Sequence, residues 1–201
     1  MDAQAALQLT DWRRQVGELY ARVRTLGAST DAWQVWREGK QRLYRDHPQS
    51  PVPQSERAGY VFACFDHDPS MRVAAALVPS PPQHQDGDDE VPGHTHVGTL
   101  HFTLSGVDCR LGAYWLDGYA GGLFVPFADA TSGHETYGGG RYVLDTVKGA
   151  DLGELDGRLV LDFNFAYNPS CSYDPRWACP LTPPANRLEI AVHAGEQMPG
   201  F

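Results

Sequence analysis

The spacing of apolar residues predicts two helices at the start of the chain. The first apolar stripe recurs with the helical period and consists of Trp12, Val16, Leu19, Tyr20, Val23 and Leu26. A second helix is expected to begin near Ser29, Thr30 and Asp31, which are typical N-cap residues. Its apolar side would consist of Trp33, Trp36, Leu43 and Tyr44, and His47-Pro48 would end it.

From Gly59 onward the hydrophobic period changes to two, which is typical of β-strands. The runs expected to form strands are Tyr60–Phe65, Arg72–Val78, Thr95–Leu104, Cys109–Leu116, Tyr119–Phe127, Arg141–Val147, Arg158–Phe165 and Arg187–Ala194. No helical pattern separates them, and turn pairs such as Asp156-Gly157 fall between them. The pattern predicts an α+β, mainly β fold in which N-terminal helices pack on an antiparallel β-sandwich or a partly open β-barrel.

The length of 201 residues suits a single domain. Residues 1–48 would be its helical N-terminal segment, and residues 59–201 its β-rich part. Residues 79–93 are polar and acidic with little to bury, so we expect a mobile loop there.

The charge balance narrows the classes of partner. Sixteen Lys and Arg residues against 25 Asp and Glu residues give a net charge of −9, which opposes binding to nucleic acid or to anionic lipid. No apolar run is long enough to span a membrane, and the start at Met1-Asp2 lacks the basic and apolar regions of a signal peptide. We therefore expect a cytoplasmic protein, with self-association left open.

The common catalytic and metal motifs are absent. The sequence has no Gly-x-Ser-x-Gly elbow, no His-Glu-x-x-His pair and no phosphate-binding glycine loop. His94 and His96 share a strand face but lack a nearby third ligand, so no metal site is predicted. Cys171 and Cys179 are either free or bridged, and nothing in the pattern indicates a particular cofactor.

Two long loops, residues 128–140 and 166–186, are polar and aromatic together, which is typical of functional loops. The segments 127–142, 161–171, 179–188 and 194–196 resemble the family called domain of unknown function 1684, which consists of bacterial and archaeal proteins. The resemblance extends over roughly residues 33–197. It implies a site but no established activity. The matching motif residues are Asp129, Thr131, Thr136, Tyr137, Gly138, Gly140, Arg141, Asp162, Asn164, Tyr167, Asn168, Cys171, Cys179, Asn186 and Glu196.

We expect a pocket around Arg141, Asp162 and Asn164, because Asp162 and Asn164 share one face of a strand that could pair with the strand beginning at Arg141. Arg141 would hold either Asp162 or an acid group of a ligand. The first hypothesis is a binding site for a small polar or anionic molecule. Its ligand-binding residues would be Asp129, Thr136, Arg141, Asn164, Tyr167, Asn168 and Trp177.

Two alternatives remain open at this stage. The first is a hydrolase-like enzyme at the same site, in which Tyr137, Asp162 and Cys171 do acid–base or cysteine chemistry. The second is a structural Arg–Asp–Asn network in a protein that associates with others through its N-terminal helices. Trp33 and Trp36 would then be exposed.

Overall fold

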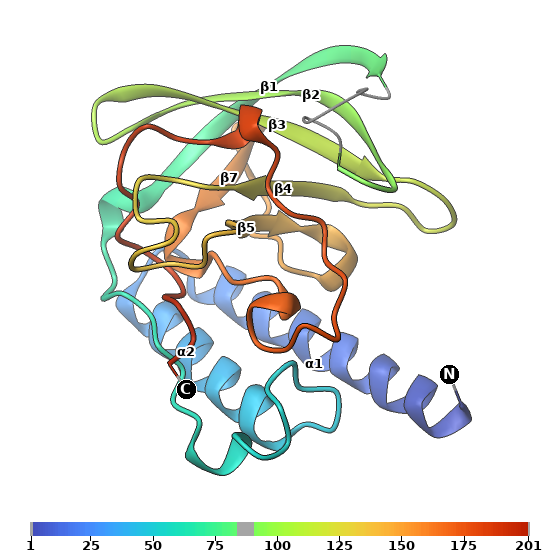
Figure 1. The fold of residues 1–201 in the computed structure, drawn as a ribbon. Coiled ribbons are helices and arrows are strands. Elements are labelled where there is room, and N and C mark those ends of the chain that lie inside the picture. The colour runs from blue at the N-terminus through green and yellow to red at the C-terminus, as the bar shows by residue number, and fades with distance from the viewer. Residues whose placement is uncertain (1, 84–90, 201) are drawn as a thin grey trace.

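The computed structural model describes residues 2–83 and 91–200. Two helices come first and a sheet follows them (Figure 1). The helices are α1 (Ala3–Leu26) and α2 (Thr30–Asp46). The strands are β1 (Arg72–Gln83), β2 (His94–Leu104), β3 (Val107–Leu116), β4 (Leu123–Phe127), β5 (Arg141–Asp145), β6 (Glu154–Leu155) and β7 (Arg158–Asp162). The α+β, mainly β fold class is confirmed.

The strands form one antiparallel sheet in the order β5-β4-β3-β2-β1-β7-β6. The sheet curls until its two ends approach each other. There Tyr142 of β5 and Tyr167, which follows β7 in the chain, exchange two backbone hydrogen bonds of 2.8 and 3.0 Å. The sheet is therefore a half-barrel, so the partly open barrel is the correct alternative and the sandwich is not.

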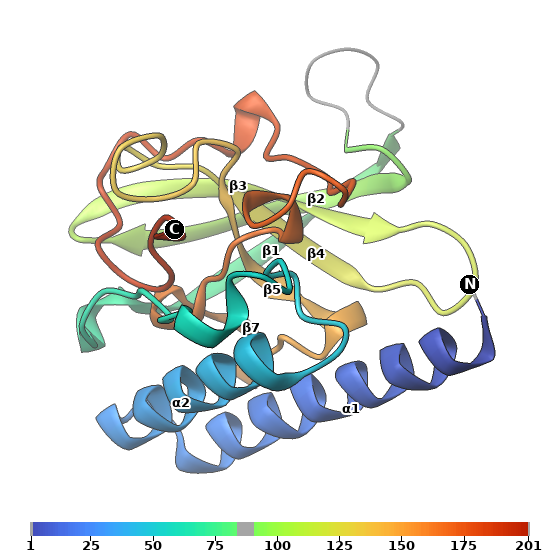
Figure 2. The same ribbon diagram turned by 60° about the horizontal axis from the view of Figure 1, so that its bottom comes forward.

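The helices lie side by side beneath the half-barrel (Figures 1 and 2). The Ser29 hydroxyl caps α2 by accepting from the backbone N–H of Ala32 at 3.1 Å, as expected of an N-cap serine. Gly39 of α2 allows the close approach to α1, because a Cβ there would lie 2.6 Å from a methyl carbon of Leu19. The two predicted helices are confirmed, although α1 begins well before its apolar stripe.

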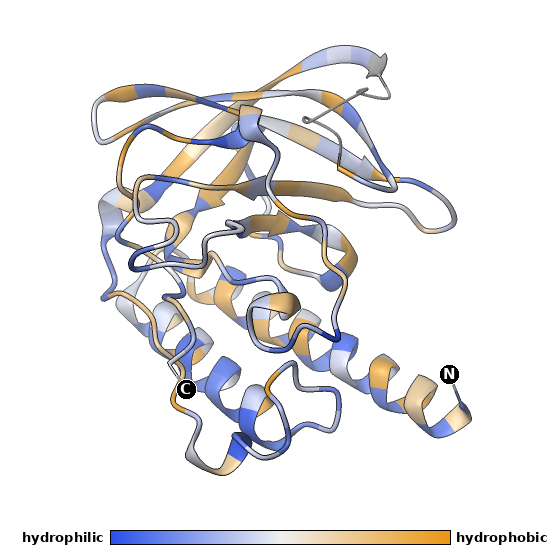
Figure 3. Cartoon of the chain, viewed as in Figure 1, coloured by the Kyte–Doolittle hydropathy of each residue, from blue (hydrophilic) through white to orange (hydrophobic). Residues whose placement is uncertain are grey.

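Figure 3 shows apolar residues in both the helices and the sheet. The buried ones form two hydrophobic clusters that hold the layers together. The first joins the helices to the sheet and is centred on Trp36, whose ring packs edge-on against Phe62 and Phe165. The second fills the interior of the half-barrel. The segment after Asn186 completes this second cluster with Leu188, Val192 and Ala194.

Several predicted segments differ from the structure. Residues 60–65 and 187–194 form no strands and contribute only single bridges, Cys64 to Glu196 and Arg187 to Ala128. The short strand β6 was not predicted. Residues 79–83 of the expected acidic loop belong to β1, and residues 84–90 lie outside the described part.

The alternative in which Trp33 and Trp36 are exposed and dock a partner is wrong, whereas their expected place on the apolar side of α2 is confirmed. Trp36 is fully buried and Trp33 is 9% exposed, so neither is available to dock a partner in this fold. Their side chains face the sheet because they belong to the apolar stripe of α2, which is removed from water by packing on the sheet. Within the described residues, neither helix is both long and apolar enough to cross a membrane.

Candidate functional site: a cleft between the helices and the half-barrel

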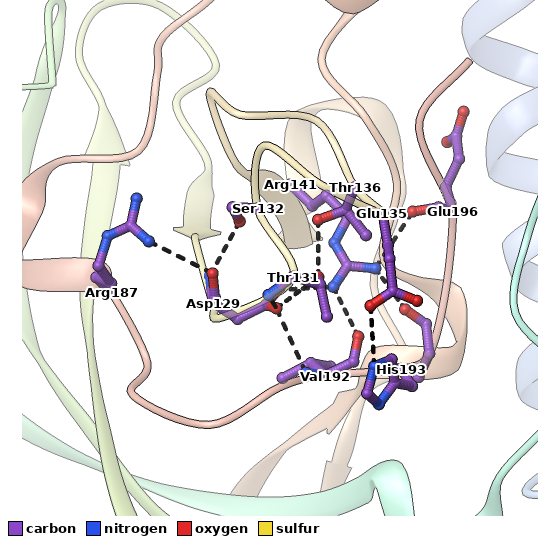
Figure 4. Close-up of polar contacts among 11 residues, drawn as sticks. Asp129, Thr131, Ser132, Glu135, Thr136, Arg141, Arg187, Val192, His193 and Glu196 are labelled. Carbon is purple, nitrogen blue, oxygen red and sulfur yellow. Dashed lines mark hydrogen bonds and ion pairs between the residues drawn. The ribbon is translucent and has the colours of Figure 1, made fainter. Parts of the chain in front are cut away.

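Arg141 at the start of β5 is fully buried in a network of protein groups (Figure 4). Its Nη2 donates to a carboxylate oxygen of Asp129 at 2.8 Å and to the carbonyl of Val192 at 3.0 Å. Its Nη1 donates to the carbonyls of Ala194 and Glu196. The guanidinium thus ties the loop after β4 to the C-terminal segment, which leaves little of it for a ligand.

The carboxylate of Asp129 is also hydrogen-bonded through both of its oxygens. Its other carboxylate oxygen accepts from the Thr131 backbone N–H at 2.7 Å and from the Thr131 hydroxyl at 2.6 Å. The hydroxyl of buried Thr136 lies 2.8 Å from that of Thr131. Three predicted site residues, Asp129, Thr136 and Arg141, therefore do meet, as parts of one buried network.

Asp162 and Asn164 lie elsewhere, and the pairing assumed for them is wrong. β7 neighbours β1, so Asp162 bonds Arg72 of β1 at 3.1 Å instead of Arg141. Asn164 lies in a short 3-10 helix, Phe163–Phe165, which Asp162 caps. Its amide bridges the backbone of Asp68, with bonds of 2.9 and 2.8 Å. Asp162 thus stabilises the start of β1, and Asn164 stabilises the segment before it.

Tyr137, Cys171 and Cys179 form a third group. The Tyr137 hydroxyl lies 3.8 Å from the Cys171 sulfur, and the Cys171 backbone N–H donates to the Cys179 sulfur at 3.3 Å. Both cysteines are thiols here. Burial raises the pKa of Cys171 and raises that of Tyr137 to about 12, so both groups hold their protons at neutral pH. This environment does not activate a cysteine nucleophile.

His94 and His96, considered as metal ligands, face aromatic rings. The ring of His94 lies 5.0 Å from that of Phe124, and the ring of His96 lies 5.4 Å from that of Tyr114. In residues 2–83 and 91–200, no three His, Cys, Asp or Glu side chains are grouped so as to hold a metal ion.

A cleft of about 330 Å³ opens between α1, the β4–β5 end of the sheet and the loop carrying Trp177. Its lining combines aromatic and aliphatic walls with a few charged groups. The residues are Leu9, Trp12, Arg13, Gln49, His94, Leu116, Phe124, Tyr142, Asp145, Val147, Lys148, Ser170, Trp177, Ala178, Cys179 and Pro180.

The turn that follows β5 positions Asp145 and Lys148 in this cleft. Asp145 ends β5, and its carboxylate accepts from the backbone N–H of Lys148 at 3.2 Å, which caps a turn of 3-10 helix, Thr146–Lys148. Gly149 follows in the left-handed conformation. The Lys148 ammonium then lies 3.4 Å from Asp145 and 5.4 Å from the centre of the Tyr142 ring. Lys148 is partly exposed, so an anion in the cleft can reach it.

A second, smaller cavity of about 50 Å³ lies deeper, between the helices and Tyr167. It shares Trp12, Lys148 and Ser170 with the cleft, so these side chains form the boundary between the two. The inner cavity is lined further by Val16, Tyr20, Lys40, Leu43, Tyr44, Pro51, Ala150, Tyr167 and Asn168.

Lys40 and Glu196 form an ion pair beside this cavity. The Lys40 Nζ lies 3.8 Å from Glu196 Oε2, and their side chains are 8% and 1% exposed. Burial lowers the pKa of Lys40 to about 8, against the pull of the Glu196 carboxylate. Burial raises the pKa of Glu196 to about 7, although Lys40 and the Asn168 backbone N–H favour its charged form. Both groups thus titrate near neutrality.

Comparison with known proteins places this architecture in a family. The model of the family described as protein of unknown function (DUF1684) matches residues 61–197. The chain belongs to this family. The part that matches the DUF1684 model holds the half-barrel, the Arg141 network, Lys148 and Glu196, whereas Lys40 and Trp12 lie before it.

The DUF1684 fold is also found among solved structures. The solution NMR structure of an uncharacterized protein of Haloarcula marismortui is similar, with a TM-score of 0.59 and 39% sequence identity. The match covers 82% of this chain and 91% of that one. No curated protein matches the chain.

Sequence reasoning therefore found part of the candidate site. Three residues predicted to bind a ligand line these spaces: Trp177 lines the cleft, and Tyr167 and Asn168 line the inner cavity. Lys40 and Lys148 were missed. One signal was present: the chain holds 14 arginines and only these two lysines, and both line the inner cavity.

Proposed function

We propose that this protein binds a small amphipathic anion, with an apolar body and one carboxylate, in the cleft between α1 and the half-barrel. The observation that carries the proposal is the lining of that cleft. A volume of about 330 Å³ falls at the lower end of the range for small-molecule sites, roughly 300–1,000 Å³. Such sites are mostly apolar with a few well-placed polar groups.

The apolar body would lie between aromatic side chains. Trp12 on α1 and Trp177 on the opposite loop line the cleft, and Phe124 and Tyr142 of neighbouring strands line it as well. The Trp12 ring is held in place because it packs against Tyr44 and His47 at centroid distances of 6.0 and 5.2 Å. A pre-positioned aromatic wall binds with a small loss of side-chain entropy.

The anionic end would meet positive charge. Lys148 and Arg13 both line the cleft, and Asp145, its one lining carboxylate among the described residues, is already engaged by Lys148 and by the Tyr167 hydroxyl. The indole N–H of Trp177 has no partner in the described part of the chain, so it remains available as a donor. A local excess of donors in an acidic protein favours an anion over a cation.

A larger hollow on the outer face of β1, β2 and β3 is a weaker candidate. It measures about 730 Å³, but its polar lining residues, which include His101, Arg110 and Arg158, are all exposed. Charges that remain hydrated gain little from binding a ligand.

The test is a calorimetric titration with 4-phenylbutanoate, compared with the neutral 4-phenylbutanol and the cationic 4-phenylbutylamine. We expect the carboxylate to bind best. Lys148→Met should weaken its binding roughly tenfold, since a charge-assisted hydrogen bond contributes about 1.5 kcal/mol. Trp177→Ala should weaken all three compounds, while Trp115→Ala, at an exposed tryptophan outside the cleft, should weaken none. Equal binding of the carboxylate and the amine would overturn the proposal.

A further inference from the structure

The two lysines of this chain, Lys40 and Lys148, line the same inner cavity. All other basic side chains, apart from the histidines, are arginines, and arginine keeps its proton at every physiological pH. A buried lysine loses its proton more readily, and the neutral amine is the form that acts as a nucleophile. The ammonium nitrogens of Lys40 and Lys148 lie 4.6 and 5.8 Å from the centre of the same Tyr167 ring.

The surroundings of Lys40 resemble those that activate an amine. Its side chain extends from α2 into a cage of rings, with its Nζ 4.2 Å from the centre of Tyr44 and within 6 Å of Trp36 and Phe62. It donates to the Tyr44 hydroxyl and pairs with Glu196. Desolvation and the second cation, Lys148, both favour the neutral amine.

One group that could accept and return a proton lies beside this amine. It is Glu196, whose Oε2 lies 3.8 Å from Lys40 Nζ and whose Oε1 has no hydrogen-bond partner in the described residues. Asn168 lines the cavity, is 2% exposed, and has its side-chain nitrogen engaged by the Gln197 carbonyl, which leaves its Oδ1 unpartnered. A buried acceptor without a partner is costly, so it indicates a place for a donor group of a bound molecule or a water.

The inner cavity has room for a functional group but not for a whole ligand. Its volume of about 50 Å³ exceeds the roughly 10–15 Å³ that a cavity needs to hold one water, and so admits a carbonyl carbon with its oxygen. The rest of the molecule would lie in the outer cleft, past the boundary formed by Trp12, Lys148 and Ser170.

We propose that Lys40 forms an imine with the carbonyl group of an amphipathic 2-oxo acid whose body occupies the outer cleft and whose carboxylate pairs with Lys148. This inference rests on the proposed function, and it adds the reactive group of the ligand. The geometry that carries it is the amine of Lys40 and the free acceptor of Asn168 on the lining of one cavity, with the carboxylate of Glu196 paired to Lys40.

The steps balance as follows. Glu196 takes a proton from the Lys40 ammonium, and the free amine nitrogen forms a bond to the carbonyl carbon while the C=O π pair moves to oxygen. A proton passes from nitrogen to that oxygen, which gives a carbinolamine whose hydroxyl can donate to Asn168. Glu196 then returns its proton to the hydroxyl, the C–O bond breaks, and water leaves. The products are the iminium on Lys40, the Glu196 carboxylate and one water.

The experiment uses 4-phenyl-2-oxobutanoate as the probe with sodium cyanoborohydride, which reduces an imine to a stable amine. Intact mass and peptide mapping then locate the label. We expect one lysine adduct, on Lys40, because burial lowers the pKa of Lys40 to about 8 and each unit by which a pKa is lowered raises the free-amine fraction about tenfold. Lys40→Arg should lose the adduct, and Lys148→Arg, which keeps the neighbouring cation, should retain it. An excess of 4-phenylbutanoate should slow the labelling.

Two results would overturn the inference. One is labelling of Lys148 as fast as that of Lys40. The other is the absence of a Lys40 adduct in protein that binds 4-phenylbutanoate normally. Titration of Lys40→Arg with 4-phenylbutanoate shows whether that variant keeps its fold and its cleft. If 4-phenylbutanoate does not bind the wild type, the proposed function fails. Labelling with acetaldehyde, which needs no outer cleft, then decides separately whether Lys40 is reactive.

Discussion

The buried pair of Lys40 and Glu196 predicts a specific dependence of stability on pH. The pKa of Glu196 rises from 4.5 to about 7 on folding, so the folded protein holds a proton that the unfolded chain has released between these two values. The contribution of Glu196 to stability should therefore fall as the pH rises from 4.5 to about 7 and should not fall further above it. The pKa difference corresponds to about 3 kcal/mol of unfolding free energy.

The assay is urea unfolding of the wild type and of Glu196→Gln across this pH range. The amide keeps the size of the side chain and its bond from the Asn168 N–H but cannot titrate. Carboxylates elsewhere contribute equally to both proteins, so they cancel in the difference. The pKa of Lys40, which the Glu196 carboxylate raises, is lower in the variant, and this adds to the relative loss of the wild type near pH 7. We expect the wild type to lose about 3 kcal/mol relative to the variant between pH 4.5 and 7. A difference that stays constant across this range would refute the reasoning.

Three further predictions concern other parts of the molecule. Arg141→Ala should destabilise the fold by about 3–5 kcal/mol, because it leaves Asp129 buried without its cation, whereas Arg176→Ala at the surface should change the melting temperature little. Gly195→Ala should destabilise more than Gly153→Ala in urea unfolding: both glycines have positive φ, but only at Gly195 would a Cβ lie 2.6 Å from two backbone carbonyl oxygens. An equal loss in both would contradict this account of Gly195. Iodoacetamide should alkylate Cys171 slowly at neutral pH and faster as the pH rises, since its pKa is raised; fast labelling at neutral pH, followed by peptide mapping, would argue for an activated thiol.

The parts of the fold that depend on local sequence could be predicted. The cap at Ser29 and the apolar stripe ending at Tyr44 act within one helix, so the sequence pattern is sufficient to find α2. The hairpin of β6 and β7 turns at Asp156-Gly157, as that pair indicates. By contrast, residues 187–194 alternate like a strand, yet they form none, because the segment bends at residues 189–190 and its Val192 backbone bonds the side chains of Arg141 and Asp129 instead of a neighbouring strand.

The candidate site was harder to predict because its residues come from distant segments. The pairing of Arg141 with Asp162 assumed that β5 and β7 are neighbours, whereas the strand order places β4 beside β5 and β1 beside β7. Lys40 looks like part of the polar face of α2, and only the packing of Glu196 and Tyr167 against it shows that it is buried. Burial by long-range contacts is not visible in the period of a single helix.

The most direct test of the ligand site uses the five tryptophans of the chain. Trp12 and Trp177 line the cleft, Trp33 and Trp36 are buried under the sheet, and Trp115 is exposed away from it. In ¹⁵N-resolved NMR spectra, the indole N–H signals of Trp12 and Trp177 should shift on titration with 4-phenylbutanoate while the other three stay in place. Shifts centred on Trp115, or no shift at Trp12 and Trp177 at saturating ligand, would contradict the proposed site.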